Sequence, residues 1–303
     1  MNEPRIHAVD GTFELYRAEF SKRPRKVAKV DGRDLDVTAT VGLVSSLLTL
    51  LGDPHERVTH LAYAFDNPIR SFRNDLFADY KDDTGVPESL SLQFDLVEEL
   101  VSSLGVRVFS MQKYEADDAL GTIARAFSAN DVRILSPDKD LAQCLEGARV
   151  VTVDRIRKRE ITYDAFVAER GYLPALVPDF LALTGDPQDG IPGLPGFGEK
   201  TAALLLGAFP GLAAIPDHPA TWPKGVRGSE KLARVLASHR PQAELYRKLA
   251  TLVTDVPLDL SIDGLRIPRA VPAAFVERAK SLGANDLLVR AEKIVREAPT
   301  RRS

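Results

Sequence analysis

The chain has 303 residues, 44% of them apolar and 27% charged, which is typical of an ordinary soluble protein with one large or two modest domains. No apolar stretch approaches the roughly 20 residues that cross a bilayer, and no apolar signal segment opens the sequence. The single cysteine, Cys144, excludes an internal disulfide and the formal net charge is only −3, so we expect a cytoplasmic protein without a membrane partner.

The first half of the chain alternates predicted strands with predicted helices, which is typical of an α/β fold. The predicted strands cover 6–9, 58–65, 106–109, 132–135 and 150–153. One predicted helix follows the first strand, and others cover 41–51, 87–100 and 116–127. The remaining segments are a polar basic connector at 21–33, a polar excursion at 67–90 and a charged hairpin at 154–160. This order predicts an open, mostly parallel sheet with helices on its faces.

Beyond residue 172 the predicted elements are all helical, which indicates a second, all-α domain. A proline-rich loop over 215–225 carries Trp222 and separates two helical sections. A predicted helix over 229–253 is interrupted at Pro241, and two short helices are predicted between 272 and 297.

Nine acidic residues stand at the ends of predicted strands, at the start of a predicted helix, or in the loops that follow. They are Asp10, Asp66, Glu115, Asp117, Asp118, Asp138, Asp140, Asp186 and Asp189. Because the carboxyl ends of parallel strands meet at one edge of a sheet, we expect these carboxylates to converge. Packed carboxylates repel one another unless cations compensate, and oxygen ligands suit Mg²⁺ or Mn²⁺. The pattern predicts a metal-dependent phosphoryl-transfer site, although each acidic pair alone is more typical of a solvated turn or a helix cap.

A glycine-rich run over 193–202 follows the last of these acids directly. Its glycines allow backbone N–H groups to approach a phosphate closely, and a helix that starts within the run adds its dipole. The spacing is not that of a Walker loop, and a plain interhelical turn is the alternative. Its position beside Asp189 favours a cradle for a phosphate backbone. The residues of this predicted cradle are Gly193, Gly196, Gly198, Lys200 and Thr201.

The segment after Asp66 carries four candidates for substrate contacts. We expect Lys81 to reach the scissile phosphate and Tyr80 to stack on an unpaired base. Arg70 and Arg73, three residues apart on a possible helix, are expected to contact phosphates, with a solvated helix face as an equally good alternative.

In their order along the chain, these motifs resemble those of the 5′-nuclease family, which comprises flap endonucleases and the 5′→3′ exonuclease domain of bacterial DNA polymerase I. The matching stretches are Val9–Thr12, Leu15–Ala18, Phe72–Arg73, Tyr80–Lys81, Tyr114–Asp118, Asp138–Leu141, Thr184–Gly193, Gly196–Ala202, Arg247–Ala250 and Thr254–Pro257. Because no polymerase region follows them, the chain resembles a stand-alone bacterial exonuclease.

The resemblance implies a PIN-like α/β domain over 1–171 with a helical arch at about 67–104. It implies an all-α DNA-binding domain over 172–265, with a helix–three-turn–helix motif at about 182–207, and C-terminal helices over 266–303. Two Mg²⁺ or Mn²⁺ sites are implied. The first would be held or oriented by Asp10, Asp66, Glu115, Asp117 and Asp118, and the second by Asp138, Asp140, Asp186 and Asp189. Lys81 would polarise the scissile phosphodiester, and backbone groups around 193–198 would hold duplex DNA, often with a K⁺ ion.

The sequence departs from the family pattern directly after Lys81. Residues 82–85, Asp-Asp-Thr-Gly, stand where family members carry an arginine, which predicts a weaker grip on a single-stranded 5′ end. Pro137 and Gly190 replace a glycine and an asparagine of the family pattern. None of the nine acids is lost, which favours retained catalysis.

The leading hypothesis is a structure-specific 5′-nuclease that hydrolyses DNA phosphodiesters at or near 5′ ends and flaps by a two-metal-ion mechanism. Its expected partner is DNA with a flap, nick, gap or free 5′ end, and we expect a monomer that acts in DNA repair and replication. A structure-selective DNA-binding protein with little turnover is the alternative, motivated by the altered residues after Lys81. A phosphatase of the haloacid dehalogenase type is disfavoured, because its nucleophile would fall on Ala8.

Overall fold

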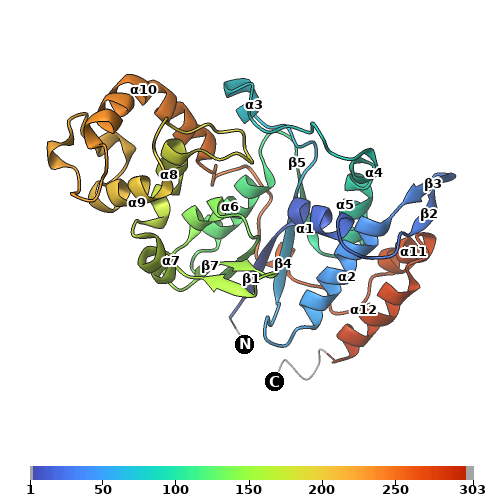
Figure 1. Ribbon diagram of the computed structural model, residues 1–303. Coiled ribbons are helices and arrows are strands. Elements are labelled where there is room, and N and C mark those ends of the chain that lie inside the picture. Colours follow the sequence, from blue (N-terminus) through green and yellow to red (C-terminus); the bar gives the residue numbers. More distant parts are fainter. Residues whose placement is uncertain (1–2, 298–303) are drawn as a thin grey trace.

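The computed structural model describes residues 3–297, and Figure 1 shows an α/β half built on one sheet with a helical half beside it. The sheet has six strands in the order β5-β4-β1-β6-β7-β8, and only β8 at one edge runs antiparallel to its neighbour. These strands are β1 (Arg5–Asp10), β4 (His60–Asp66), β5 (Arg107–Met111), β6 (Asp131–Leu135), β7 (Val150–Asp154) and β8 (Arg159–Ile161). The predicted mostly parallel α/β fold is confirmed.

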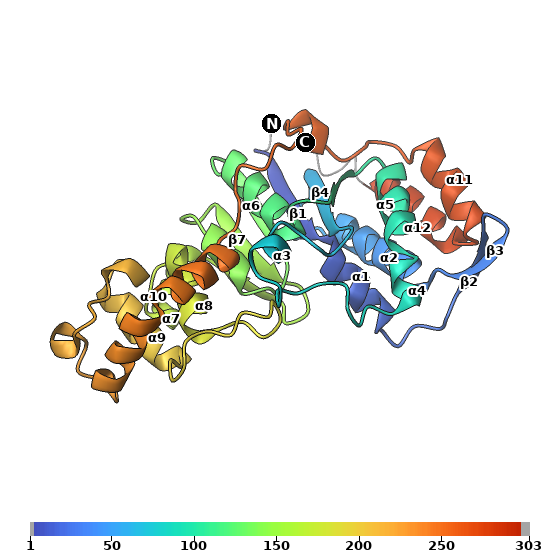
Figure 2. The same cartoon turned by 90° about the horizontal axis from the view of Figure 1, so that it is seen from above.

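Helices cover both faces of this sheet, as Figure 2 shows from above. Along β1, Val9 packs with one layer of helices, whereas Ile6 and Ala8 pack with helix α6 (Ala116–Ala126) on the other face. The first layer consists of α1 (Gly11–Glu19), α2 (Thr38–Gly52), α5 (Phe94–Ser103), α11 (Ala273–Ser281) and α12 (Asn285–Glu297). Strands that are buried on both faces need continuous apolar runs, which is why the sequence pattern predicted them.

A hairpin that the sequence interpretation missed begins within the connector at 21–33 and ends just beyond it. Its strands are β2 (Val27–Val30) and β3 (Arg33–Asp36), paired antiparallel. Asp31 and Gly32, the two residues of the turn, have φ angles of 49° and 78°. Two positive φ values are what a tight hairpin turn of the Asp-Gly type requires, so this dipeptide was the available signal.

The segment between β4 and β5 holds only short helices before α5. They are α3 (Arg73–Leu76) and α4 (Glu88–Ser91), and irregular chain joins them. The predicted helix over 87–100 is interrupted after α4 because Gln93 is drawn into the core, where its side-chain oxygen accepts hydrogen bonds from the backbone N–H and the hydroxyl of Thr40.

The helical half has its own hydrophobic core. Its helices are α7 (Tyr163–Arg170), α8 (Val177–Thr184), α9 (Glu199–Ala208) and α10 (Ser229–Ala250). The predicted interruption of α10 is present, because His239, two residues before Pro241, has non-helical φ and ψ angles of −119° and 17°. From α10 the chain runs back past α6 to α11 (Figure 2), and Leu252 and Val253 pack against the core beneath α6.

Short 3₁₀ helices complete the described chain. They are η1 (Asp140–Cys144), η2 (Pro174–Leu176), η3 (Leu212–Ala214), η4 (Pro219–Thr221) and η5 (Asp263–Leu265). Within residues 3–297, no helix combines the length and apolar character that crossing a membrane requires.

Candidate active site

The carboxyl ends of the central strands bring four acidic side chains together. Asp10 ends β1 and Asp66 ends β4, while Asp138 follows β6 and Asp117 lies in the first turn of α6. Asp66 Oδ1 accepts a hydrogen bond of 2.7 Å from the N–H of Ala116, which fixes the start of α6 against the end of β4. After burial, the negative charges of Asp138, Asp10 and Asp66 raise the pKa of Asp117, so these carboxylates share one site.

Burial and mutual repulsion raise the pKa values of these acids. Burial, followed by the charge of Asp66, raises the pKa of Asp10 to about 7. Burial, together with the charge of Glu115, raises the pKa of Asp66 to about 6. The pKa of Asp117 is raised well above its ordinary value by burial and by Asp138 and Asp10. The site therefore contains more negative charge than the neighbouring lysine side chains compensate, which favours binding of a metal cation.

A second acidic group lies on two loops beside the first. Asp138 and Asp140 follow β6, and Asp186 and Asp189 lie on the loop after α8. Burial and the charge of Asp138 raise the pKa of Asp140 to about 9, and its Oδ1 atom is buried without a hydrogen-bond partner. Asp186 Oδ2 pairs with Lys139 Nζ at 3.0 Å. An orphaned carboxylate oxygen in this setting fits a site for a hard cation.

Lys81 connects the two acidic groups. Its Nζ atom lies 3.1 Å from Glu115 Oε2 and 2.9 Å from Asp189 Oδ1, and its backbone N–H donates to the carbonyl of Asp189. Its side chain keeps 25% exposure. The structure thus places Lys81 in the site, with a partly exposed side chain whose ammonium group lies between the two acids.

Tyr80 requires a correction to the predicted stacking role. The side chain is only 3% exposed and packs in the core of the helical half. Its hydroxyl lies 3.2 Å from both Glu115 Oε2 and Asp189 Oδ2. An enclosed ring cannot stack on an unpaired base. Tyr80 instead holds Glu115 and Asp189 in place through its hydroxyl group.

Arg73 and Asp118 also require corrections. Arg73 is 1% exposed and forms a two-pronged pair with Asp118, so it is not on the surface where a phosphate would contact it. Asp118 is fully buried, and its two oxygens also accept hydrogen bonds from the N–H groups of Glu115 and Val253. With both oxygens bound to nitrogen donors, Asp118 is not free to bind a metal. Arg70, by contrast, is exposed as expected.

The glycine-rich run is only partly available to a ligand. Gly196, Gly198 and Lys200 are exposed at the start of α9, and Thr201 is half-buried in its first turn. Gly193 is buried, and a Cβ atom there would lie 2.4 Å from the backbone nitrogen of Gly185. The role of Gly193 is therefore corrected, because close packing of the loop requires this glycine and shields it from a phosphate.

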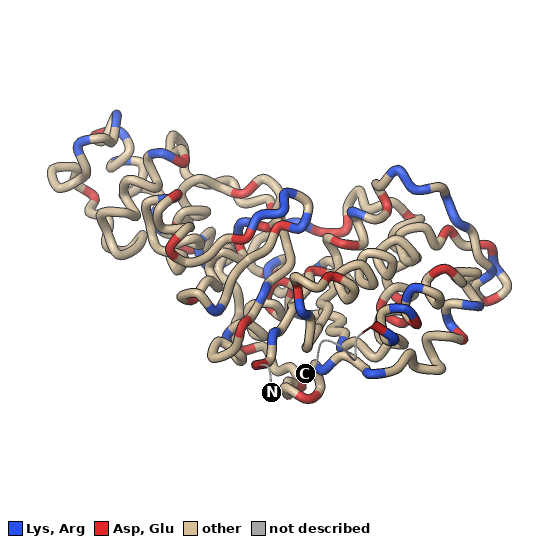
Figure 3. The backbone as a smooth tube through the Cα atoms, turned by 90° about the horizontal axis from the view of Figure 1, so that it is seen from below, with Lys and Arg blue, Asp and Glu red and all other residues tan. Residues whose placement is uncertain are grey.

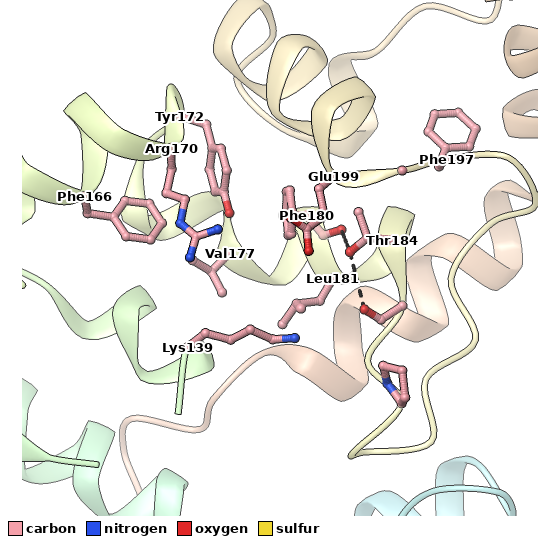
Figure 4. A pocket seen from close by; sticks show the side chains of 13 residues that line it. Lys139, Phe166, Arg170, Tyr172, Val177, Phe180, Leu181, Thr184, Phe197 and Glu199 are labelled. Carbon is pink, nitrogen blue, oxygen red and sulfur yellow. Dashed lines mark hydrogen bonds between the residues drawn. The ribbon is translucent and has the colours of Figure 1, made fainter. Parts of the chain in front are cut away.

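A cavity of about 370 Å³ lies beside the second acidic group, between α7, α8 and the start of α9. Figure 4 shows Arg170 beside Phe166 and Tyr172, and Lys139 extended below Val177 and Leu181. The sequence interpretation missed this cavity, since its lining comes from separate segments and forms no local motif. Lys139 is shared between the cavity and Asp186.

The donor set fits divalent cations in its chemistry. Within residues 3–297, no three acidic, histidine or cysteine side chains stand ready to hold one ion without moving. Lys81 and Lys139 already pair with Glu115, Asp186 and Asp189, so these oxygens become available only when the lysines withdraw. The oxygen-only donors, the unpartnered Asp140 oxygen and the raised pKa values nonetheless match Mg²⁺ or Mn²⁺ rather than a softer metal.

Basic and acidic positions are interspersed over both halves of the molecule, as Figure 3 shows. Leaving the nine acids out changes the formal net charge from −3 to +6, and the basic residues behind this value are spread along the chain. A dispersed basic character is compatible with contacts to a phosphate backbone at several places.

Comparisons with known proteins agree with this geometry. Residues 5–171 match the family model for the 5′-3′ exonuclease N-terminal resolvase-like domain, and residues 172–272 match that for the 5′-3′ exonuclease C-terminal SAM fold. A 5′-3′ exonuclease of Aquifex aeolicus is 30% identical over 299 residues, which cover 98% of each chain. DNA polymerase I of Pseudomonas aeruginosa is 36% identical over 278 residues, covering 88% of this chain but 29% of the polymerase.

Solved structures share the fold at low sequence identity. T5 5′-exonuclease with bound zinc aligns with a TM-score of 0.62 and 17% identity, over 96% of this chain and 98% of that one. The catalytic core of Rad2 in complex with a DNA substrate aligns with a TM-score of 0.60 and 14% identity, over 96% and 92% of the two chains.

Proposed function

The chain belongs to the 5′-3′ exonuclease family, and from that premise we propose that it is a metal-dependent nuclease that cleaves DNA at or near 5′ ends and flaps with two Mg²⁺ or Mn²⁺ ions. The observation that carries this proposal is the convergence of Asp10, Asp66, Asp117 and Asp138 at one edge of the sheet, with mutually raised pKa values. Like charges held this close suit a site built for compensating cations.

The two acidic groups would hold different ions. Glu115, Asp10, Asp66 and Asp117 would hold the catalytic ion, and Asp138, Asp140, Asp186 and Asp189 would hold the second. When bound, such ions lower the pKa of a water molecule and neutralise charge on the departing oxygen. The chain itself places the backbone that carries these carboxylates, at the carboxyl ends of β1, β4 and β6 and at the start of α6.

Lys81 would orient the scissile phosphate. Its ammonium group lies between Glu115 and Asp189 and remains partly exposed, so a phosphate oxygen can replace a carboxylate as its partner. A cation directed at the reacting phosphate stabilises the negative charge that develops there. Residues 82–85, with two carboxylates and high exposure, extend from Lys81 toward solvent, so the hold on a single-stranded 5′ end would be weak.

The start of α9 would hold the duplex part of the substrate. Gly196 and Gly198 expose backbone there, Lys200 adds positive charge, and K⁺ is the ion we propose between this loop and a DNA phosphate. The proposed substrates are flapped, nicked, gapped or free-ended DNA, bound by a monomer in the cytoplasm.

Cleavage of labelled 5′-flap, nicked and blunt DNA in Mg²⁺, Mn²⁺ and Ca²⁺ tests the proposal. We expect cleavage in Mg²⁺ or Mn²⁺, and a rate at least about 10²-fold lower for Asp10→Ala and Asp138→Ala, because a lost ligand removes several kcal/mol of transition-state stabilisation. Asp259→Ala, at a side chain that is 90% exposed, is the matched control and should cleave normally.

Normal rates for Asp10→Ala and Asp138→Ala would contradict this assignment. Tight flap binding in Ca²⁺ without cleavage in Mg²⁺ or Mn²⁺ would instead support the alternative of a structure-selective DNA-binding protein, which the two acids after Lys81 favour.

A further inference from the structure

Arg73 is the bulkiest of the fully buried side chains in the described part of the molecule. Burial of a guanidinium group costs several kcal/mol unless hydrogen bonds and opposite charge compensate it. Arg73 lies eight residues before Lys81 in the sequence, and its contacts show what compensates the cost of burying its charge.

Every N–H of this guanidinium faces an acceptor. Nη1 and Nη2 each donate to one oxygen of Asp118 at 2.8 Å, and Nη1 also lies 3.3 Å from Glu115 Oε1. Nε donates to the carbonyl of Leu249 at 2.7 Å, and Nη2 donates to the carbonyl of Thr251 at 3.0 Å. Four hydrogen bonds and the ion pair with Glu115 surround the group, so it directs no donor at a DNA phosphate.

Asp118 extends the same network. Its Oδ2 atom accepts from the N–H of Glu115 at 2.9 Å, and its Oδ1 atom accepts from the N–H of Val253 at 2.8 Å. The first bond belongs to the capping box at the start of α6, which sets where Glu115 and Asp117 point. The second holds the chain that returns from α10.

The Arg73–Asp118 pair therefore joins three segments that are far apart in sequence. The first is the chain after β4, which reaches Lys81 eight residues after Arg73. The second is the start of α6, with two acids of the proposed catalytic ion site. The third is the end of α10 with the irregular segment that follows it, residues 249–253, where the chain leaves the helical half.

We infer that Arg73 is a positioning residue: through Asp118 it fixes Glu115, Asp117 and Lys81 relative to one another and to the end of α10. The inference rests on the proposed nuclease function. It replaces the predicted phosphate contact at Arg73 with a role in geometry, so that changes at Arg73 alter turnover and metal binding while DNA affinity stays the same.

A lysine at position 73 cannot perform this role. Its ammonium group has three donors at one point, whereas the carboxylate of Asp118 and the carbonyls of Leu249 and Thr251 lie in different directions around a planar group. Arg73→Lys keeps the charge, so its effects report loss of geometry.

The test compares Arg73→Lys with two matched controls. Arg70→Gln changes an exposed arginine three residues earlier, and Arg133→Lys changes a buried arginine that pairs with Glu56 and Glu160, neither of which belongs to the proposed metal sites. For each protein we measure kcat and KM on flap DNA, the Kd for the same DNA in Ca²⁺ as a function of salt, and Mn²⁺ binding by calorimetry.

For Arg73→Lys we expect kcat to fall about 10- to 100-fold, the size of effect that a misplacement of about 1 Å produces, while Kd and its salt dependence stay unchanged. Mn²⁺ binding should weaken. Arg70→Gln should weaken DNA binding and lower the salt slope by about 1, the signature of a lost phosphate contact. Arg133→Lys should lower thermal stability and leave Mn²⁺ binding unchanged.

A lower salt slope for Arg73→Lys would overturn the inference, because it would show a DNA contact. An unchanged kcat with unchanged Mn²⁺ binding would overturn it too. Asp118→Asn provides a second variant if Arg73→Lys does not fold, with the same expected pattern. If the wild-type protein binds Mn²⁺ but cleaves nothing, the proposed function fails, whereas the comparison of Mn²⁺ binding still decides the role of Arg73.

Discussion

The two ends of the same sheet both bury charged groups, but they balance them differently. At the amino end, Glu56 accepts hydrogen bonds of 3.1 Å from both His7 and Arg133, and Arg133 also pairs with Glu160. These partners lower the pKa of Glu56 to about 2, with the hydrogen bond from His7 as the largest cause. At the carboxyl end, burial and neighbouring acids raise the pKa of Asp10 to about 7.

The difference teaches that charge imbalance marks the functional end of the sheet. Both ends contain buried charges in hydrogen-bonded networks, so burial alone does not distinguish them. At the amino end each acid has a basic partner, and the network stabilises the fold. At the carboxyl end, Lys81 and Lys139 are too few for the acids around them, and the remaining charge is available to bind cations.

The largest effect should separate the two ends by activity. Asp117→Asn removes a carboxylate from the acid-rich end, and we expect kcat/KM on flap DNA to fall about 10²- to 10⁴-fold, since several kcal/mol of stabilisation by the metal site is lost. Glu56→Gln is the matched change at the amino end. It should keep kcat/KM within about threefold, because Glu56 contacts none of the proposed metal ligands. Similar losses in both variants would show that the ends do not differ in function.

A smaller effect should appear in thermal stability without metal. In EDTA, Asp117→Asn relieves repulsion and should raise Tm by about 2–4 °C for each kcal/mol gained. Glu56→Gln leaves His7 and Arg133 without their shared acceptor and should lower Tm by a few degrees, given a cost of about 1–3 kcal/mol for such a hydrogen bond. Scanning calorimetry of both variants measures this, and a fall in Tm for both would contradict a difference in charge balance.

The smallest effect should lie in the pH dependence of stability. The lowered pKa of Glu56 means that its ionised form stabilises the fold fully above pH 4.5, its ordinary value, and that this contribution is lost as the pH falls toward about 2. At the other end the sign is reversed: the raised pKa of Asp10 means that, without metal, stability falls as the pH rises from about 4 to about 7.

Urea unfolding in EDTA at several pH values measures both signs. The difference between wild type and Glu56→Gln should shrink below pH 4.5, and Asp10→Asn should remove part of the loss of stability above pH 4. A constant difference for Glu56→Gln down to pH 2.5 would be inconsistent with its lowered pKa.

Much of the fold was predictable because local patterns are strong where strands are buried on both faces. The central strands β1, β4 and β6 each appear in the sequence as an apolar run. An acidic residue ends or follows each of these runs, so the acids could be assigned to the carboxyl ends of the strands. The hairpin of β2 and β3 was not predicted, because its strands are only four residues long and half-exposed and so form no apolar run. The break between α4 and α5 was also missed, since it depends on the partner that buried Gln93 finds in Thr40.

The sequence by itself determined the fold class and the family, because these depend on residue types and on their order along the chain. Only the tertiary structure decided the fate of individual polar side chains. Arg70 and Arg73 are alike in sequence, yet one lies in solvent and the other is enclosed, because the acceptors of Arg73 come from residues 118 and 249–251. Partners that distant in sequence leave no local pattern, so the enclosed position of Arg73 was decided by packing.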